Sequence, residues 1–156
     1  SAGQISQTFA TTVGDSYVVR FALSGNPDNP VLKTLVVSAT GAPPTTYTYD
    51  NTGNTRAAMN WVDRLYSFTA TAANTTLRFT SATAGVFGPA LDNVRVHQVA
   101  GSKDDCKNGG WQALVDEWGN TFTNQGDCVS YIATGGKNPG AGGAPCREGK
   151  TGAEVW

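Results

Sequence analysis

The chain has 156 residues, a formal net charge of −1 and only 15% charged residues. This length fits one domain with a small extension, and the charge provides no basic surface for nucleic acid or an anionic membrane. Thr, Ser, Asn and Gly are abundant and no run of about eighteen apolar residues occurs, so we expect a β-rich, secreted or surface-associated protein without membrane insertion.

Short runs rich in β-branched and aromatic residues recur between residues 4 and 99, separated by turn residues. The clearest strand lies at 17–24, where Tyr17, Val19, Phe21 and Leu23 alternate with a more mixed set of residues. In chain order, the predicted strands cover 5–11, 17–24, 32–39, 45–49, 61–71, 75–80 and part of 85–99. This spacing is typical of an antiparallel β-sandwich.

The stretch 85–99 is predicted to be a loop that turns into a long strand. From Val94 onward, the alternation predicts one buried face and one solvent-facing face that carries Arg95 and His97. Asp92 and Asn93 lie where the loop enters this strand. A carboxylate there could bind a cation or cap a turn.

The composition changes after residue 100, which predicts a sandwich domain over 1–100, an appendix over 101–134 and a Gly-rich tail over 135–156. In the appendix, Asn124 followed by Asp127 predicts a helix N-cap. Val129, Tyr131 and Ile132 would form a short buried face of that helix, which we expect to end near residue 135.

Three cysteines lie in the C-terminal third of the chain. Pairing Cys106 with Cys128 would close a loop of about twenty residues and contribute about 3 kcal/mol, and the secreted-type composition favours this disulfide. Cys146 then remains as a free thiol or as one half of an intermolecular bridge. Zinc is not expected, because a single histidine accompanies three widely spaced cysteines.

Three segments match a known family in the same order: GQISQTFATTVGDSYVVRFALSGNPDNP, AAMNWVDRLYSFTATAANTTLRFTS and AGVFGPALDNVRV. They resemble the choice-of-anchor C family of bacterial secreted proteins. The resemblance implies a galactose-binding-like jelly roll of the carbohydrate-binding-module type, secreted and non-catalytic. Members of that family carry further strands before the first motif. The resemblance therefore implies that edge strands are missing here, cleaved away, or supplied by a neighbouring chain.

The same resemblance suggests a structural calcium ion. Asp92 corresponds to a ligand of that ion, and Asp28 in the oxygen-rich loop 26–29 could complete the donor set. The alternative is that Asp92 and Asn93 only satisfy backbone donors at a turn.

Sugar binding would require exposed aromatic faces and planar polar groups. Tyr47, Tyr49, Arg56 and Trp61 lie on or beside neighbouring strands and loops and form the predicted ligand platform. Trp111 and Trp118 in the appendix are the alternatives. For each aromatic taken singly, packing in the sandwich is the competing explanation.

Catalysis has little support in the sequence. His97 is the only histidine, so a nucleophilic triad would depend on this one residue. Carboxylates for glycoside hydrolysis exist, but no pattern singles out two of them; they include Asp50, Asp63, Asp116 and Glu117. Residues 144–151 satisfy a loose phosphate-loop pattern without the preceding strand, and we interpret this match as chance.

We therefore predict a secreted, non-catalytic β-sandwich module that binds polysaccharide or cell-wall glycan. The alternative is a structural or adhesive subunit of an extracellular assembly, either self-associating or completed by a donor strand from a neighbouring chain.

Overall fold

The computed structural model describes residues 3–143 and 153–154. The elements are β1 (Gln4–Ala10), β2 (Ser16–Gly25), β3 (Leu32–Ala39), β4 (Thr45–Asp50), β5 (Val62–Thr69), β6 (Asn74–Ser81), β7 (Pro89–Val99), the 3₁₀ segment η1 (Lys107–Gln112), β8 (Leu114–Val115), α1 (Gln125–Ala133) and β9 (Ala153–Glu154). No helix in this described part is long and apolar enough to cross a membrane. Cys146 and the phosphate-loop-like segment 144–151 lie outside it.

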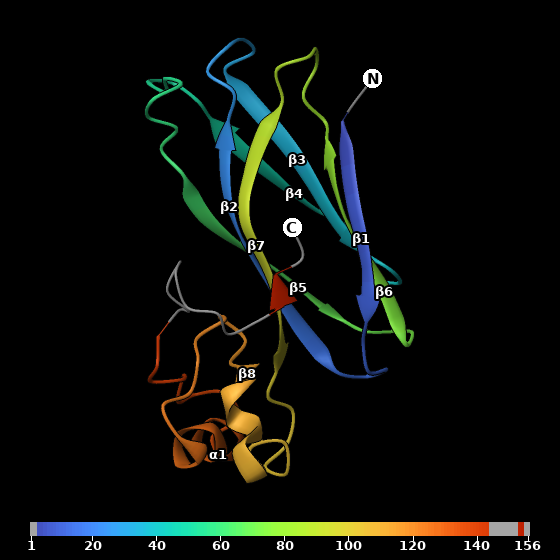
Figure 1. Cartoon of the computed structure of the whole chain (residues 1–156), viewed down its shortest axis with the longest axis vertical. Coiled ribbons are helices and arrows are strands. Elements are labelled where there is room, and N and C mark those ends of the chain that lie inside the picture. The colour runs from blue at the N-terminus through green and yellow to red at the C-terminus, as the bar shows by residue number, and fades with distance from the viewer. Residues whose placement is uncertain (1–2, 144–152, 155–156) are drawn as a thin grey trace.

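Two sheets pack face to face (Figure 1). One sheet has the strand order β1-β6-β3-β4, and the other has β5-β2-β7-β8, with β9 also paired to β7. From β1 to β7, every connection except β3–β4 crosses between the sheets, as in a jelly roll. The long strands pair antiparallel, whereas β8 runs parallel to β7. The predicted antiparallel β-sandwich with a small disulfide-containing appendix is confirmed.

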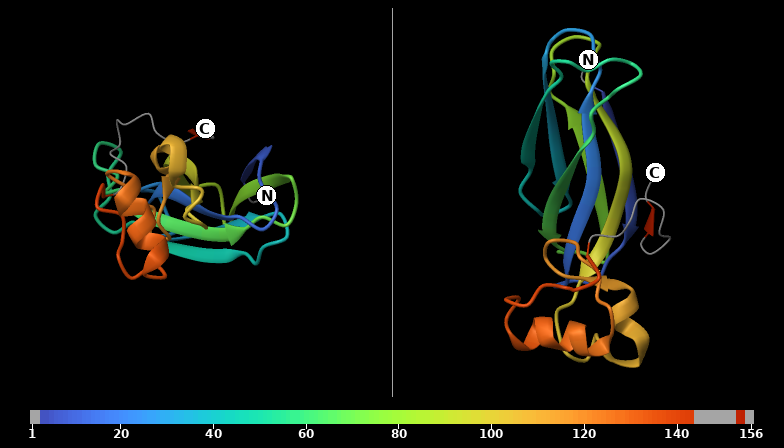
Figure 2. Two further views of the ribbon diagram at one scale, coloured as in Figure 1. Left: turned by 90° about the horizontal axis from the view of Figure 1, so that it is seen from below. Right: turned by 90° about the vertical axis from the view of Figure 1, so that its left-hand side faces the viewer.

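The two ends of the sandwich differ in what covers them. Loops 26–31, 51–61 and 82–88 gather at one end, here called the apex, and loops 11–15, 40–44 and 70–73 form the other end, the base. The appendix follows β7 and lies against the base (Figure 2). Any surface that the sandwich and the appendix share therefore lies at the base and not at the apex.

The core lies between the sheets and contains the apolar side chains that alternate along β2. Val19, Phe21 and Leu23 are completely buried. Phe21 makes edge-to-face contacts with Phe79 and with Tyr47, each with ring centroids 5.3 Å apart. Alternation in the sequence therefore identified this face correctly.

The opposite face of the β2–β7 pair is also buried, so the prediction that Arg95 and His97 face solvent is wrong. Their side chains are only 5% and 6% exposed. Strand β9 pairs with β7 beside Arg95. From the appendix, Gly119 approaches so closely that a Cβ there would lie 3.8 Å from Val18. Later segments of the chain therefore cover a face that alternation alone assigns to solvent.

β7 begins before Val94, so Asp92 and Asn93 lie inside the strand and not at its entrance. Asn93 has a φ of 53°, in the left-handed region that Asn tolerates, and the register with β2 shifts between Arg20 and Ala22. These features define a β-bulge. Asp92 Oδ1 accepts the backbone N–H of Asn93 at 2.8 Å, which is the local capping role that was the alternative to calcium binding.

The appendix has its own small core. The predicted disulfide between Cys106 and Cys128 is confirmed, and both cysteines are buried. Asn124 caps α1 as predicted, because its side chain accepts the N–H of Asp127 at 2.9 Å. Phe122 packs against Tyr131 with centroids 5.6 Å apart.

The appendix continues beyond its predicted end at residue 134. The backbone N–H of Gly140 donates to Asp116, and that of Ala141 donates to Asp127, both at 3.0 Å. These bonds fasten the beginning of the Gly-rich segment to the appendix. Gly-rich composition alone did not predict this attachment, because the acceptors lie in earlier parts of the chain.

Candidate functional site

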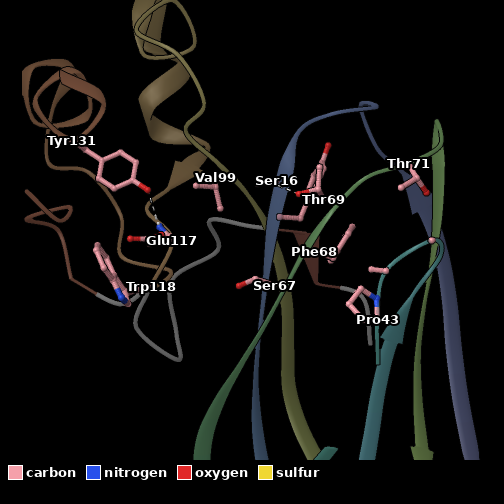
Figure 3. A pocket seen from close by; sticks show the side chains of 13 residues that line it. Ser16, Pro43, Ser67, Phe68, Thr69, Thr71, Val99, Glu117, Trp118 and Tyr131 are labelled. Carbon is pink, nitrogen blue, oxygen red and sulfur yellow. Dashed lines mark hydrogen bonds between the residues drawn. The ribbon is translucent and has the colours of Figure 1, made fainter. Parts of the chain in front are cut away.

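A cleft of about 740 Å³ lies where the base of the sandwich meets the appendix (Figure 3). Its sandwich wall comes from the beginning of β2, the end of β5 and the β3–β4 and β5–β6 loops. Its opposite wall comes from the loop after β8 and from α1. The cleft therefore depends on the contact between the sandwich and the appendix.

The appendix wall presents one large aromatic surface beside polar groups. The side chain of Trp118 is 45% exposed and that of Glu117 is exposed as well. The Tyr131 ring is buried, and its hydroxyl accepts the backbone N–H of Glu117 at 3.3 Å. Burial raises the pKa of Tyr131, so the hydroxyl keeps its proton at neutral pH and remains able to donate.

The loop that carries Trp118 is held by Asp116, whose side chain is completely buried. Its Oδ1 accepts the backbone N–H of Trp118 at 2.9 Å and of Asn120 at 2.8 Å. Its Oδ2 accepts the side chain of Asn120 at 2.8 Å and the backbone N–H of Gly140 at 3.0 Å. Gly119 supplies the positive φ, +77°, that closes the turn. The indole is therefore presented by a loop with little freedom to move.

The sandwich wall is rich in hydroxyl groups. Ser16, Ser67, Thr69 and Thr71 line it and are all exposed. The hydroxyl oxygens of Ser16 and Thr69 lie 3.4 Å apart on neighbouring strands. Each hydroxyl can donate one hydrogen bond and accept two, so this wall can match ligand hydroxyls in several orientations.

The two walls together have the composition of a site for a polyhydroxylated ligand. An exposed indole can pack on the C–H face of a pyranose ring, while hydroxyls and a carboxylate bind the ring substituents. Figure 3 shows Trp118 and Glu117 on the side opposite Pro43 and Thr71, with the cleft between them.

Two of the four predicted platform residues are directed into the protein. Tyr49 is only 6% exposed, and its hydroxyl donates to the carbonyl of Asn60 at 2.7 Å. Tyr47 is half-buried against the core and donates to the carbonyl of Leu65 at 2.6 Å. The prediction that both rings form a stacking surface is wrong, because their positions on β4 direct them inward.

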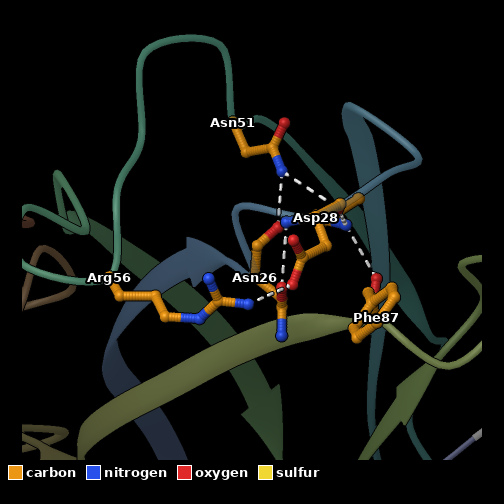
Figure 4. Close-up of polar contacts among 6 residues, drawn as sticks. Asn26, Asp28, Asn51, Arg56 and Phe87 are labelled. Atoms are coloured by element: carbon orange, nitrogen blue, oxygen red, sulfur yellow. Dashed lines mark hydrogen bonds and ion pairs between the residues drawn. The ribbon is translucent and has the colours of Figure 1, made fainter.

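The other two platform residues belong to the apex. Arg56 is 80% exposed and forms an ion pair with Asp28 at 2.8 Å (Figure 4). It lines a smaller hollow of about 410 Å³ together with Asn26 and Met59. Trp61 is half-buried just before β5. The structure therefore does not unite the four residues in one surface.

The residues predicted to bind calcium do not form a recognisable donor set. The Asp28 carboxylate is paired with Arg56, and Asp92 caps the next backbone N–H. Among the described residues, no three His, Cys, Asp or Glu side chains are grouped as metal ligands. Calcium binding stays a prediction that this arrangement of donors does not favour.

Trp118 was predicted only as an alternative ligand-binding residue, and the hydroxyl wall was not predicted from the sequence. Ser16, Ser67 and Thr69 carry no local signal, since hydroxyl residues are common throughout the chain. The usable signal was the Trp118–Gly119 pair, where a large aromatic precedes a glycine two residues after a short apolar run.

Parts of several solved structures are similar to this chain. A structure described as CBM4 shares 13% identity, with a TM-score of 0.45, over 61% of this chain and 60% of that chain. A family 35 carbohydrate-binding module from Clostridium thermocellum shares 21% identity, with a TM-score of 0.39, over 60% of this chain and 68% of that chain. A family GH115 4-O-methyl-α-glucuronidase with specificity for decorated arabinogalactans shares 22% identity, with a TM-score of 0.44, over 62% of this chain and 13% of that one.

Sequence comparison with curated proteins gives no significant match. Residues 1–97 match the family described as "Protein of unknown function (DUF642)", which covers β1 to β6 and most of β7. The narrower choice-of-anchor C resemblance is not confirmed by this match. Because more than half of the chain matches, the protein belongs to the DUF642 family.

Proposed function

We propose that this protein binds polysaccharide, without cleaving it, in the cleft between the base of the sandwich and the appendix. The exposed indole of Trp118 opposite a wall of exposed hydroxyls is the observation that carries the proposal. An aromatic face with few but well-placed polar groups is the usual arrangement for holding sugar rings.

The arrangement of acidic side chains at the cleft supports binding over hydrolysis. Among the described residues that line it, Glu117 is the one acidic side chain. The neighbouring Asp116 is completely buried and accepts four hydrogen bonds that hold its own loop. Glycoside hydrolysis uses two carboxyl groups flanking the scissile bond, and this pair of residues does not offer that geometry.

An extracellular location is part of the proposal. The disulfide between Cys106 and Cys128 supports it, since disulfides persist mainly in oxidising compartments. The glycan would then be a component of a cell wall or of the surrounding matrix.

A glycan array and affinity electrophoresis against soluble polysaccharides test the proposal. We expect Trp118→Ala to weaken binding about tenfold or more, since a stacked aromatic contributes on the order of 1 kcal/mol beyond its buried area. Trp61→Ala at the apex is the matched control and should bind like the wild type. Loss of binding in Trp61→Ala alone would move the site to the apex. No binding of any glycan by the wild type would overturn the proposal.

An open strand edge supports a second candidate function, as a subunit of an extracellular assembly. β8 and β9 pair with the part of β7 nearest the base. Within the described part of the chain, no strand pairs with the same edge from Pro89 to Val94. Beside this edge, Ile5, Phe79 and Leu91 line a groove of about 610 Å³. A strand with alternating apolar residues from a neighbouring copy would fit both features.

Light scattering and negative-stain microscopy, with and without reductant, test this second candidate. Filaments or large oligomers that disappear in Ile5→Lys but persist in Val13→Lys would support it, since Ile5 lines the groove and Val13 is an exposed apolar residue at the base. A compact monomer near 16.3 kDa at all concentrations would overturn it.

A further inference from the structure

A buried lysine lies at the centre of the apex. Lys33 is located on β3, and its side chain has no solvent exposure. Its Nζ donates to the backbone carbonyl of Asp28 at 2.6 Å and to that of Phe87 at 2.7 Å (Figure 4). The first carbonyl belongs to loop 26–31 and the second to loop 82–88. One side chain therefore connects two loops that are distant in sequence.

The third apical loop joins the same cluster through Asn51, which is only 4% exposed. Its side-chain nitrogen donates to the carbonyl of Asn26, and its backbone N–H donates to the carbonyl of Val31 at 3.0 Å. The stem of Lys33 is tightly surrounded, since a Cβ on Gly25 would lie 2.6 Å from its Cγ. All three apical loops are therefore held by buried hydrogen bonds.

Converging backbone carbonyls are the type of ligand that a hard cation such as Ca²⁺ takes in a loop. At the apex, these carbonyls accept hydrogen bonds from the side-chain nitrogens of Lys33 and Asn51. Hydrogen bonds that an ammonium donates are charge-assisted, and a buried ammonium needs such bonds; here it donates to two backbone carbonyls. Burial lowers the pKa of Lys33, and the carboxylate of Asp28 opposes that effect.

We propose that the Lys33 ammonium is the internal cation of the apex and takes the place of the calcium ion expected at loop 26–29. The apical loops therefore keep their structure without a divalent metal. This inference concerns the scaffold and holds whatever ligand the basal cleft binds.

Thermal unfolding of the whole chain in millimolar Ca²⁺ and in EGTA tests the metal independence. We expect the same midpoint in both conditions, for the wild type and for Asp28→Asn. A rise of several degrees in Ca²⁺ that is present in the wild type and lost in Asp28→Asn would overturn the inference.

Replacing the ammonium tests the role of Lys33 directly. Lys33→Met leaves the carbonyls of Asp28 and Phe87 without their donor, and we expect the midpoint to fall by about 5–10 °C. Lys107→Met, which removes the same charge from an exposed side chain of the appendix, should change it little. Equal midpoints for the two variants would contradict the inference.

Amine labelling of the native wild type gives a result even if Lys33→Met does not fold. Reaction with an N-hydroxysuccinimide ester, followed by peptide mass spectrometry, should modify Lys103, Lys107 and Lys137, which are exposed. Lys33 should react at least about a hundredfold more slowly than these lysines, because the reagent reaches it only when the apex opens locally. Labelling of Lys33 at the rate of the exposed lysines would overturn its assignment as a buried cation.

Discussion

The apex and the base of the sandwich are both built from loops, but their polar groups are directed differently. At the apex, Lys33, Asn51 and Tyr49 are buried and bind the backbone of the loops that surround them. At the base, Ser67 and Thr69 are exposed and line the cleft. The apex thus satisfies its own hydrogen bonds, whereas the base presents donors and acceptors to a ligand.

This difference separates scaffold from site. Buried polar networks specify one conformation, since each of their groups would be costly to leave without a partner. An exposed aromatic such as Trp118 is useful for recognition only if its loop is equally well held. The appendix provides that support through the buried carboxylate of Asp116, so a well-held loop carries the exposed surface that faces the cleft.

The largest effect should come from removing this buried carboxylate. Asp116→Ala leaves the N–H groups of Trp118, Asn120 and Gly140 without an acceptor, and we expect a loss of about 3–5 kcal/mol in the free energy of unfolding of the appendix. Denaturant titration followed by tryptophan fluorescence measures this loss. Asp104→Ala, at a carboxylate that is 85% exposed in the same appendix, is the control and should stay within about 0.5 kcal/mol of the wild type. Similar stabilities for both variants would show that Asp116 does not hold the loop.

The next effect should come from the disulfide. Replacing both Cys106 and Cys128 by Ser should destabilise the appendix by about 3 kcal/mol, because the unfolded loop gains conformational freedom. The disulfide joins two residues of the appendix and does not include the apex, so labelling of Lys33 should stay slow in this variant. A parallel loss of protection at Lys33 would mean that the sandwich and the appendix unfold as one unit.

Features set by neighbouring residues in the chain could be predicted from the sequence, and those set by distant contacts could not. Asn124 and Asp127 form the predicted cap because the two residues lie on one helical turn. The alternation along β3 also places Lys33 on the same inward face as Leu35 and Val37, a signal that the usual exposure of lysine obscures.

The cleft is the feature that local patterns could not reveal. Gly119 of the appendix lies close to Val18 of β2, although the two residues are far apart in sequence, and no periodicity in the sequence predicts such a contact. His97, which alternation placed in solvent, is also buried. For the aromatics, strand register directs Tyr49 inward beside Lys33, while Trp118 stands on a turn and stays exposed.

His97 gives a pH-dependent test of how tightly the later segments cover the sandwich. Burial lowers the pKa of His97, and the charges of Arg95 and Arg20, the latter paired with Asp63, lower it further. The unfolded histidine titrates near 6.5, so below about that pH the unfolded state binds more protons and the folded state loses stability. We expect the unfolding free energy to fall from pH 7 toward the lowered pKa. His97→Gln should lack this part of the pH dependence, and an identical profile for both proteins would contradict the assignment.

The smallest effect concerns the charge of the ligand, and this prediction rests on the cleft being the glycan site. Glu117 is the one carboxylate among the described residues that line the cleft, and no Lys or Arg of that part of the chain lines it. A uronic acid bound there would lie near a like charge, which at a solvated surface costs on the order of 1 kcal/mol. Glu117→Gln should therefore improve binding of acidic glycans relative to neutral ones by about fivefold, measured by affinity electrophoresis at low salt. Asp50→Asn at the apex removes the same charge far from the cleft and should leave the ratio unchanged. If both variants shift the ratio equally, overall charge and not the cleft selects the ligand.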